Sequence, residues 1–156
     1  MIRRLMERMY DIVIYTDGAC KGNPGPGGYG AVILVGGQKI AELSGGEPQT
    51  TNNRMEMMAV IKGLSHDLVA TGGVGKRILV VSDSKYVLGG ISQWMKNWKR
   101  NNWKTSKKEP VKNQDLWEEM DRISSSYAVQ FKWIKGHAGH KWNELADQLA
   151  GQGIPV

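Results

Sequence analysis

Three apolar segments near the start of the chain are rich in β-branched and aromatic side chains and cover residues 10–16, 29–35 and 38–44. Gly36 and Gly37, between the last two segments, are typical of a tight hairpin. We therefore expect three antiparallel strands. The first should stop at Asp17, a loop rich in glycine and proline should follow up to Gly28, and another loop should cover residues 45–51.

After this loop the spacing of apolar residues changes to three and four positions, which predicts an amphipathic helix. The helix should cover residues 53–68, with Asn53 as its N-cap and Glu56 at the third helical position. Its recurring apolar residues are Met58, Ile61, Leu64 and Leu68.

The second half of the chain predicts two more strands. Residues 77–82 contain a continuous apolar run, typical of a strand that is buried on both faces and parallel to a neighbour. Alternating side chains in residues 129–133 indicate a half-exposed strand. Further helices are expected over residues 84–89, 91–101, 113–125 and 142–150. The fold class is therefore α/β: a single domain with a mixed five-stranded sheet, three antiparallel strands followed by parallel strands, flanked by helices.

The chain has 156 residues, a length that fits one domain, and a formal net charge of +6. We expect residues 1–9 to be an N-terminal extension, with Met9 as an alternative start, and residues 10–156 to be the domain. Residues 96–112 hold seven basic residues and one acidic residue, while the rest of the chain is balanced. This local excess of basic charge favours a nucleic-acid partner, and we call residues 91–112 the basic handle.

Several classes of protein are excluded by composition. No apolar run approaches the ~18 residues of a membrane span, so we expect no membrane partner. The single cysteine, Cys20, cannot form an intramolecular disulfide, and no apolar signal segment is found, which favours the cytoplasm. One cysteine and the histidine spacing fit no zinc site.

Four acidic residues stand where a solvated surface charge is not expected. Asp17 and Asp83 terminate predicted strands, and strand ends in α/β sheets point into the ligand crevice. Glu56 lies on a small apolar helix face, and Asp147 lies on the last helix, three residues after Glu144. Clustered carboxylates repel one another unless cations hold them ionised, and carboxylate ligands suit Mg²⁺ or Mn²⁺. Two such ions are a known arrangement for attack on a phosphodiester.

Three of these acids also have a plain structural explanation. Asp83 before Ser84 is compatible with a helix N-cap. Glu56 is compatible with a capping box that starts at Asn53, and Asp17 with a simple turn. The residues alone leave both interpretations open.

His137 lies in a short loop between Gly136 and Gly139. A mobile imidazole near its pKa can transfer a proton at neutral pH. The alternative is an ordinary surface histidine, which is the interpretation we give His66 and His140.

The aromatic residues of the basic handle suggest a binding surface. Trp94 and Trp98 are four positions apart and share a helix face, and Lys96, Lys99 and Arg100 surround them. Indole faces can pack against sugars or bases while the basic groups neutralise phosphates. The alternative is an amphipathic helix with tryptophans in the core and solvated lysines, and both can hold in part.

A set of motifs occurs in order over nearly the whole chain, from residue 10 to residue 150. They are Thr16-Asp17-Gly18-Ala19-Cys20, Gly22-Asn23-Pro24-Gly25-Pro26-Gly27-Gly28, Thr51-Asn52-Asn53-Arg54-Met55-Glu56, Ser82-Asp83-Ser84, Asn97-Trp98-Lys99, Val111-Lys112-Asn113, and Gly136-His137-Ala138-Gly139-His140 followed by Asp147. In these motifs the chain resembles the type 1 ribonucleases H, stand-alone bacterial enzymes that cut the RNA of RNA/DNA hybrids. The set is specific, whereas no single motif would suffice.

The resemblance implies a ribonuclease H-like domain and an endonuclease that hydrolyses the RNA strand of RNA/DNA hybrids. The products would carry 5′-phosphate and 3′-hydroxyl ends, and His137 would assist proton transfer or product release. We expect a free-standing monomer. The carboxylates that would hold two Mg²⁺ ions, with Mn²⁺ as an alternative, are Asp17, Glu56, Asp83 and Asp147.

The resemblance also implies contacts with both strands of the hybrid. Asn23, Asn52 and Asn53 would approach the minor groove, where 2′-hydroxyls distinguish RNA from DNA. Thr51 and Asn113 would hold a phosphate of the DNA strand. Tyr86, Trp94 and Trp98 would line the DNA channel, and the remaining basic contacts are expected from Lys85, Lys99 and Arg100.

Three positions depart from the family pattern. Lys85 follows Ser84 where relatives often carry a neutral side chain, and it can add a phosphate contact. Gln49 stands where some relatives place an arginine, which predicts a weaker DNA-phosphate pocket. Lys141 and Trp142 replace a pair of proline and an acidic residue, which affects the loop that carries His137.

Two other functions remain to be weighed. A non-catalytic hybrid-binding module would need the basic handle and the asparagines but gains nothing from clustered carboxylates. A basic α/β protein that binds RNA by charge alone would bind every duplex alike.

Overall fold

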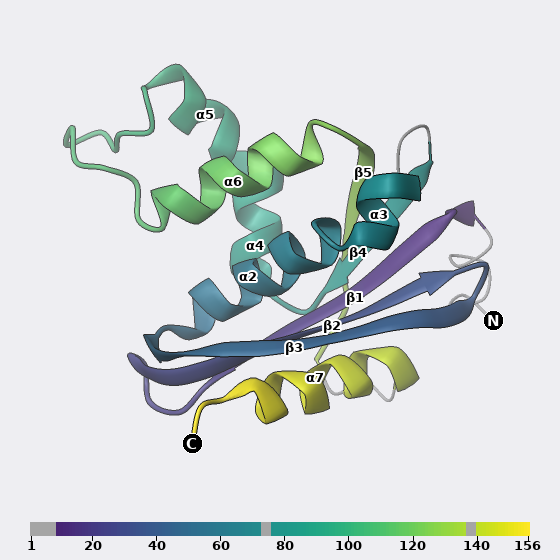
Figure 1. Ribbon diagram of the computed structural model, residues 1–156. Helices are drawn as coiled ribbons and strands as arrows, with labels where there is room; N and C mark the ends of the chain where they lie inside the picture. Colours follow the sequence, from purple (N-terminus) through teal and green to yellow (C-terminus); the bar gives the residue numbers. More distant parts are fainter. Residues whose placement is uncertain (1–8, 73–75, 137–139) are drawn as a thin grey trace.

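A five-stranded sheet of order β3-β2-β1-β4-β5 forms the centre of the computed structural model, which describes residues 9–72, 76–136 and 140–156 (Figure 1). The first three strands are antiparallel, and β4 and β5 continue the sheet in parallel from β1, which confirms the predicted mixed sheet. Apart from Met9, the expected N-terminal extension lies outside the described residues. The strands are β1 (Ile12–Cys20), β2 (Gly25–Val35), β3 (Gln38–Thr50), β4 (Arg77–Ser82) and β5 (Ala128–Trp133).

Helices cover both faces of the sheet, with α2 and α6 on one face and α7 on the other (Figure 1). Because side chains alternate along a strand, Ile14 and Ile33 belong to the core under α2, whereas Val13 and Leu34 belong to the core against α7. None of the helices in the described ranges is long and apolar enough to span a membrane. The helices are α2 (Asn52–Leu64), α3 (Asp67–Gly72), α4 (Lys85–Gly89), the π-helical turn η1 (Gly90–Trp94), α5 (Met95–Arg100), α6 (Gln114–Ser124) and α7 (Lys141–Gly153).

The glycine-rich segments that we predicted as loops belong largely to strands. Strand β1 continues past Asp17 to Cys20, and β3 includes residues 45–50. A Cβ atom at Gly28 would lie 2.1 Å from the carbonyl oxygen of Ala150 on α7. Glycine at this position therefore allows the helix to lie directly on the sheet, a requirement that has the same sequence signature as a turn.

The predicted helix over residues 53–68 is two helices, because α2 ends at Leu64 and α3 begins at Asp67. Leu68, which we placed on the apolar face, is 46% exposed. The N-cap of α2 is Thr51 rather than Asn53: its Oγ1 accepts a hydrogen bond from the backbone N–H of Arg54 at 3.2 Å.

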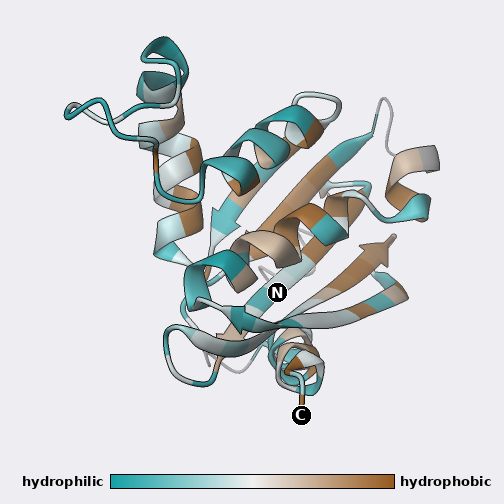
Figure 2. Cartoon of the chain, turned by 60° about the vertical axis from the view of Figure 1, so that its left-hand side comes forward, coloured by the Kyte–Doolittle hydropathy of each residue, from teal (hydrophilic) through white to brown (hydrophobic). Residues whose placement is uncertain are grey.

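The basic handle projects away from the sheet and is largely hydrophilic (Figure 2). Its α-helical part covers only residues 95–100 of the predicted 91–101, because a π-helical turn precedes it. The chain then returns in a narrow loop, in which the N–H of Val111 donates to the carbonyl of Trp103 at 2.9 Å. The seven basic side chains of residues 96–112 are all exposed.

Candidate active site and nucleic-acid interface

Three carboxylates meet at one end of the sheet. Strand β1 carries Asp17, and Asp83 directly follows β4, which runs parallel to β1 in the register that pairs Tyr15 with Val81. Glu56 reaches the same place from α2. One oxygen from each carboxylate lies within 4.8 Å of the others. The structure thus brings together three of the four acids expected at the site.

A glycine allows Glu56 to approach the strand. A Cβ atom at Gly18 would lie 2.4 Å from the backbone nitrogen of Glu56, so only a residue without a side chain lets α2 pack this close to β1. Glu56 is 5% exposed, and no described residue donates a hydrogen bond to its Oε2. Because Thr51 caps the helix, the capping-box explanation for Glu56 is wrong. The Ser84 side chain caps α4, so Asp83 is not an N-cap either.

The cluster is electrostatically costly without cations. Burial, the charge of Asp83 and a hydrogen bond with Asp147 raise the pKa of Asp17 to about 8. Burial and the charges of Asp17 and Asp83 also raise the pKa of Glu56 well above its ordinary value. Each shift reflects the poor solvation and mutual repulsion of the ionised forms. A cation at the centre of the cluster would instead stabilise the ionised carboxylates.

The fourth acid approaches from the opposite face of the sheet. Asp147 lies on α7, is half-buried, and acts on Asp17 through a hydrogen bond and through its charge. Its neighbour Glu144 is exposed. His137 lies outside the described residues, although the preceding Gly136 adjoins the cluster: a Cβ atom there would lie 2.9 Å from Oδ2 of Asp83.

The donor set fits a divalent cation. Among the described residues, the ligand atoms that come together here are carboxylate oxygens, which Mg²⁺ and Mn²⁺ prefer. The buried Oε2 of Glu56, which has no hydrogen-bond donor among the described residues, is the kind of atom that a metal ion satisfies. Asp17, Glu56 and Asp83 could therefore hold a divalent metal.

Polar residues gather around the N-terminus of α2, one turn before Glu56. Oδ1 of Asn23 accepts a hydrogen bond from the backbone N–H of Asn52 at 3.1 Å, which ties the loop after β1 to the helix. Thr51 caps the helix, and Asn53 is half-buried in its first turn. The three asparagines that we expect at the minor groove therefore lie together, and Thr51, which we expect at a DNA phosphate, lies beside them.

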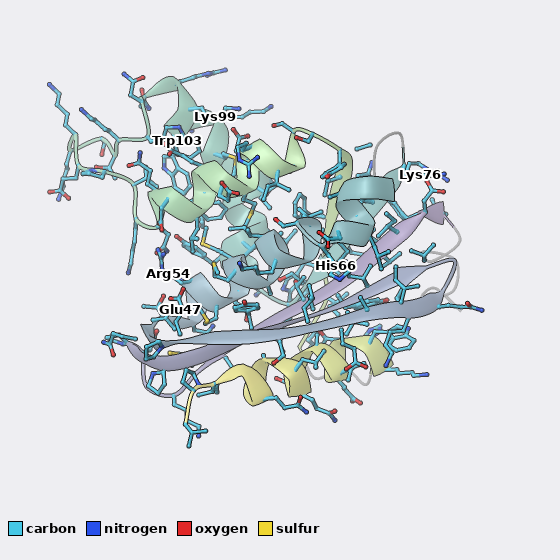
Figure 3. All side chains as sticks on the ribbon, viewed as in Figure 1. Glu47, Arg54, His66, Lys76, Lys99 and Trp103 are labelled. Atoms are coloured by element: carbon cyan, nitrogen blue, oxygen red, sulfur yellow. The ribbon has the colours of Figure 1, made fainter. Side chains whose placement is uncertain are left out.

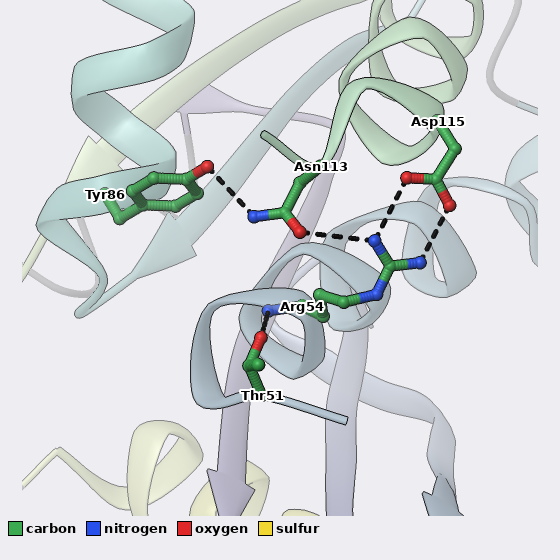
Figure 4. A network of polar contacts seen from close by, with 5 residues as sticks. All are labelled: Thr51, Arg54, Tyr86, Asn113 and Asp115. Carbon is green, nitrogen blue, oxygen red and sulfur yellow. Dashed lines mark hydrogen bonds and ion pairs between the residues drawn. The ribbon is translucent and has the colours of Figure 1, made fainter. Parts of the chain in front are cut away.

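Asn113 is linked to α2 by a network that sequence reasoning missed (Figure 4). Arg54 donates to both carboxylate oxygens of Asp115, at 3.0 and 2.7 Å, and to Oδ1 of Asn113 at 3.2 Å. Nδ2 of Asn113 donates to the hydroxyl of Tyr86 at 3.0 Å. Arg54 and Asp115 are 61 positions apart, and no local pattern pairs them.

An aromatic series connects this network to the basic handle. The ring of Tyr86 lies 5.9 Å from Trp94 and 5.4 Å from Trp117, and Trp98 lies 6.0 Å from Trp94. Trp98 packs against the core, whereas Trp94 is 38% exposed. Trp103 packs on Trp98 and lies at the base of the projecting loop (Figure 3). Both interpretations of the tryptophans therefore hold in part: Trp98 is half-buried against the core, and Trp94 is more available to a ligand.

The expected basic contacts differ in their freedom to bind. Lys85 is exposed, and its ammonium lies 5.4 Å from the centre of the Trp133 ring. Lys99 is exposed but forms an ion pair of 3.2 Å with Asp121 of α6. Arg100 is exposed.

The three departures from the family pattern also have a place in the structure. Lys85 lies on α4, beside the carboxylate cluster. Gln49 is exposed on β3. The ammonium of Lys141 lies 4.5 Å from the centre of the Trp142 ring, at the start of α7.

Comparison with known proteins identifies relatives along almost the entire chain. The RNase H family model matches residues 9–155. A ribonuclease H from Alcanivorax borkumensis is 53% identical over 146 residues, which cover 94% of this chain and 93% of that protein. A ribonuclease H from Marinobacter nauticus is 54% identical over 143 residues, which cover 92% of this chain and 93% of that protein.

Solved structures agree with the sequence relatives. LC9-RNase H1, described as a type 1 RNase H with the type 2 active-site motif, has a TM-score of 0.80 at 31% identity, over 92% of this chain and 71% of that one. LC11-RNase H1, solved in complex with an RNA/DNA hybrid, has a TM-score of 0.71 at 29% identity, over 92% of this chain and 96% of that one. With sequence and fold in agreement over nearly the full length, the chain belongs to the RNase H family of endoribonucleases.

Proposed function

We propose that this chain hydrolyses the RNA strand of RNA/DNA hybrids as an endonuclease. The observation that carries the proposal is the burial of Asp17 and Glu56 beside Asp83, with oxygens within 4.8 Å of one another. Carboxylates buried this close together raise the free energy of the fold, so a purely binding protein has no use for them. The hybrid bound to the solved relative supports the class of substrate.

Asp17, Glu56, Asp83 and Asp147 are the proposed ligands of two Mg²⁺ ions, with Mn²⁺ as an alternative. When bound, the ions would supply positive charge that activates a water and stabilises the leaving 3′-oxygen, giving 5′-phosphate and 3′-hydroxyl ends. The chain itself holds Asp17 within β1, Asp83 directly after β4, and the other two carboxylates on α2 and α7, and it keeps Glu56 away from water. His137 would assist proton transfer or product release.

The surrounding residues fit the two strands of a hybrid. The polar group at the start of α2 would read the minor groove, where 2′-hydroxyls mark the RNA strand. Thr51 and Asn113 would hold a phosphate of the DNA strand, and the exposed Trp94 would pack against its sugars or bases. The proposed contacts are Asn23, Thr51, Asn52, Asn53, Lys85, Tyr86, Trp94, Trp98, Lys99, Arg100 and Asn113. Because all of them come from one chain, we propose that a monomer is active.

A strand-specific cleavage assay tests the function. Labelled RNA in a hybrid should be cut with Mg²⁺ and spared with EDTA, while free RNA, free DNA and the DNA strand of the hybrid stay intact. Asp17→Asn should abolish cleavage but still retard the hybrid on a gel. Glu144→Gln is the matched control on the exposed side of α7 and should keep activity.

Two results would contradict the proposal. Equal cleavage of duplex DNA would point to a nuclease of different specificity. A wild-type chain that retards the hybrid but never cuts it with Mg²⁺ or Mn²⁺ would be a binding module without catalysis.

A further inference from the structure

The hydrogen bonds around Tyr86 have a direction that the chemistry of the side chains dictates (Figure 4). A guanidinium can only donate, so the Asn113 atom that faces Arg54 at 3.2 Å must be the carbonyl oxygen Oδ1. The amide therefore turns its NH₂ group toward the hydroxyl of Tyr86, 3.0 Å away. The ion pair between Arg54 and Asp115 fixes this orientation from outside.

A second donor approaches the same hydroxyl. The indole nitrogen of Trp117 lies 3.2 Å from the Tyr86 oxygen, and an indole N–H is a donor only. Trp117 is fully buried and packs 5.4 Å from the Tyr86 ring, so this contact is rigid. The oxygen of Tyr86 therefore accepts two hydrogen bonds, and its own proton must point in a third direction.

No described residue accepts that proton in a hydrogen bond. Two donors to one hydroxyl withdraw electron density from its oxygen and make the O–H a stronger donor. The tyrosine is only half-buried, so its O–H can reach a bound ligand. The arrangement is a pre-oriented donor that lacks its acceptor.

We propose that the hydroxyl of Tyr86 donates to a non-bridging phosphate oxygen of the DNA strand. A phosphate oxygen only accepts hydrogen bonds, which matches a site where Arg54, Asn113 and Trp117 leave only a donor. The nearby carboxylate of Asp115 is already held by two hydrogen bonds from Arg54. Arg54 and Asp115 act as positioning residues, because they orient Asn113 and through it the Tyr86 proton.

The DNA strand is the partner that the geometry favours. The RNA strand must pass the carboxylate cluster at which it is cut. Tyr86 is instead one helical turn beyond Asp83, on the side where Trp94 and the basic handle continue the surface. This inference rests on the proposed function and adds a specific phosphate contact to it.

A combined protein and substrate variation tests the contact. Hybrid binding is measured in EDTA, so that cleavage plays no part, with a single methylphosphonate placed in turn at each position of either strand. Wild-type affinity should fall at every phosphate that the protein contacts. At one position of the DNA strand, about tenfold of the fall should come from the hydrogen bond of Tyr86. Tyr86→Phe should bind the unmodified hybrid about tenfold more weakly, and at that position alone its fall should be about tenfold smaller than that of wild type.

The readouts separate this role from a structural one. The methylphosphonate comparison is made within each variant, so a change in the folded fraction cancels. The slope of affinity against salt should stay unchanged, because Tyr86 carries no charge. Tyr10→Phe is the matched control: it removes a hydroxyl that donates to Gln130 at 2.5 Å, far from this network, and should bind like wild type.

A second variant guards against misfolding of Tyr86→Phe. A 3-fluorotyrosine at position 86 has a more acidic hydroxyl and nearly the same shape. It should tighten binding of the unmodified hybrid, but not of the hybrid whose methylphosphonate replaces the phosphate that Tyr86 contacts. If the effects of Tyr86→Phe and of the methylphosphonate on affinity multiply at every position, the inference is wrong while the proposed function stands. The same conclusion follows if only methylphosphonates in the RNA strand weaken binding. A wild-type chain that does not bind hybrid at all would overturn both.

Discussion

The indole nitrogen of Trp133 donates a hydrogen bond to the backbone carbonyl of Asp83 at 3.0 Å. Trp133 is the last residue of β5 and pairs with Ser82, the last residue of β4. This pairing holds the backbone directly before Asp83. The face of the Trp133 ring also contacts the ammonium of Lys85. Trp133 was not among the residues that the sequence pointed to, because an exposed aromatic at a strand end has no distinctive pattern.

Replacing Trp133 with Phe should lower kcat about tenfold with little change in KM, because a carboxylate displaced by a fraction of an ångström is poorly placed for the reaction. Steady-state kinetics on a labelled hybrid measure the change. Trp142→Phe is the matched control, since this ring also carries a lysine ammonium but lies on α7. A rise in KM alone would show that Trp133 acts through the substrate rather than through Asp83.

Gly18→Ala should destabilise the fold by about 1–3 kcal/mol, the usual cost of overpacking. The added methyl would lie 2.4 Å from the backbone nitrogen of Glu56 and would push α2 away from β1. Activity should fall with it, because Glu56 leaves the cluster. Urea unfolding and the cleavage assay measure the two effects.

Gly151→Ala is the control for this substitution. It lies within α7 with no atom inside 4 Å of the new Cβ, and alanine favours a helix by about 1 kcal/mol over glycine. This variant should therefore be as stable as wild type or more so. If Gly18→Ala behaved in the same way, the close approach of α2 would not depend on glycine.

Asp17→Asn should stabilise the metal-free protein at alkaline pH. The pKa of Asp17 is raised from its ordinary 3.8 to about 8, so this group contributes stability at low pH that is lost as pH rises through about 8. The neutral amide avoids that loss. The variant should exceed wild type above the raised pKa by at least about 1.4 kcal/mol, the value of one unit of displaced pKa.

Urea unfolding in EDTA, near pH 4 and near pH 9, measures this difference, and the two proteins should be nearly equal at the lower pH, which is close to the ordinary pKa of 3.8. Added Mg²⁺ should stabilise wild type at the higher pH and the variant much less. Glu144→Gln, an exposed acid on α7, should show no such pH-dependent gain. A variant less stable than wild type at alkaline pH in EDTA would contradict the clustered-charge interpretation.

Replacing Lys96, Lys99, Arg100 and Lys104 with Ala should weaken hybrid binding and flatten its salt dependence by about 0.9 for each phosphate that is no longer neutralised. The turnover rate at saturation should change little, because the handle stands apart from the carboxylates. Lys99→Ala alone should have less effect than Arg100→Ala, because Lys99 is paired with Asp121. Lys62→Ala, an exposed lysine on α2, serves as the control. An unchanged salt slope would mean that the handle lysines are only solvated.

Local pattern was enough to predict the five strands, although not all of their ends, and to connect Asp17 and Asp83 with two of them. The alternation of apolar and polar residues, and the unbroken apolar run in residues 77–82, reflect which faces of a strand are buried. Residues two positions apart lie on the same face, so this pattern is visible over a short stretch of sequence. A continuous run indicates a strand with neighbours on both sides. Once β1 and β4 are adjacent and parallel, the carboxylates of Asp17 and Asp83 converge.

Contacts between distant segments lay beyond any such pattern. A glycine that permits close approach looks the same in sequence as a glycine that makes a turn, which is why Gly18 and Gly28 were assigned to loops rather than to strands. The pairing of Arg54 with Asp115 joins residues 61 positions apart, and the proton direction at Tyr86 depends on it. Such contacts arise from how whole elements pack, which residue preferences and spacing do not encode. The burial of Glu56 and the orientation of Tyr86 therefore belong to the assembled fold, whereas the strand pattern and the association of Asp17 and Asp83 with two of the strands can be read from the chain alone.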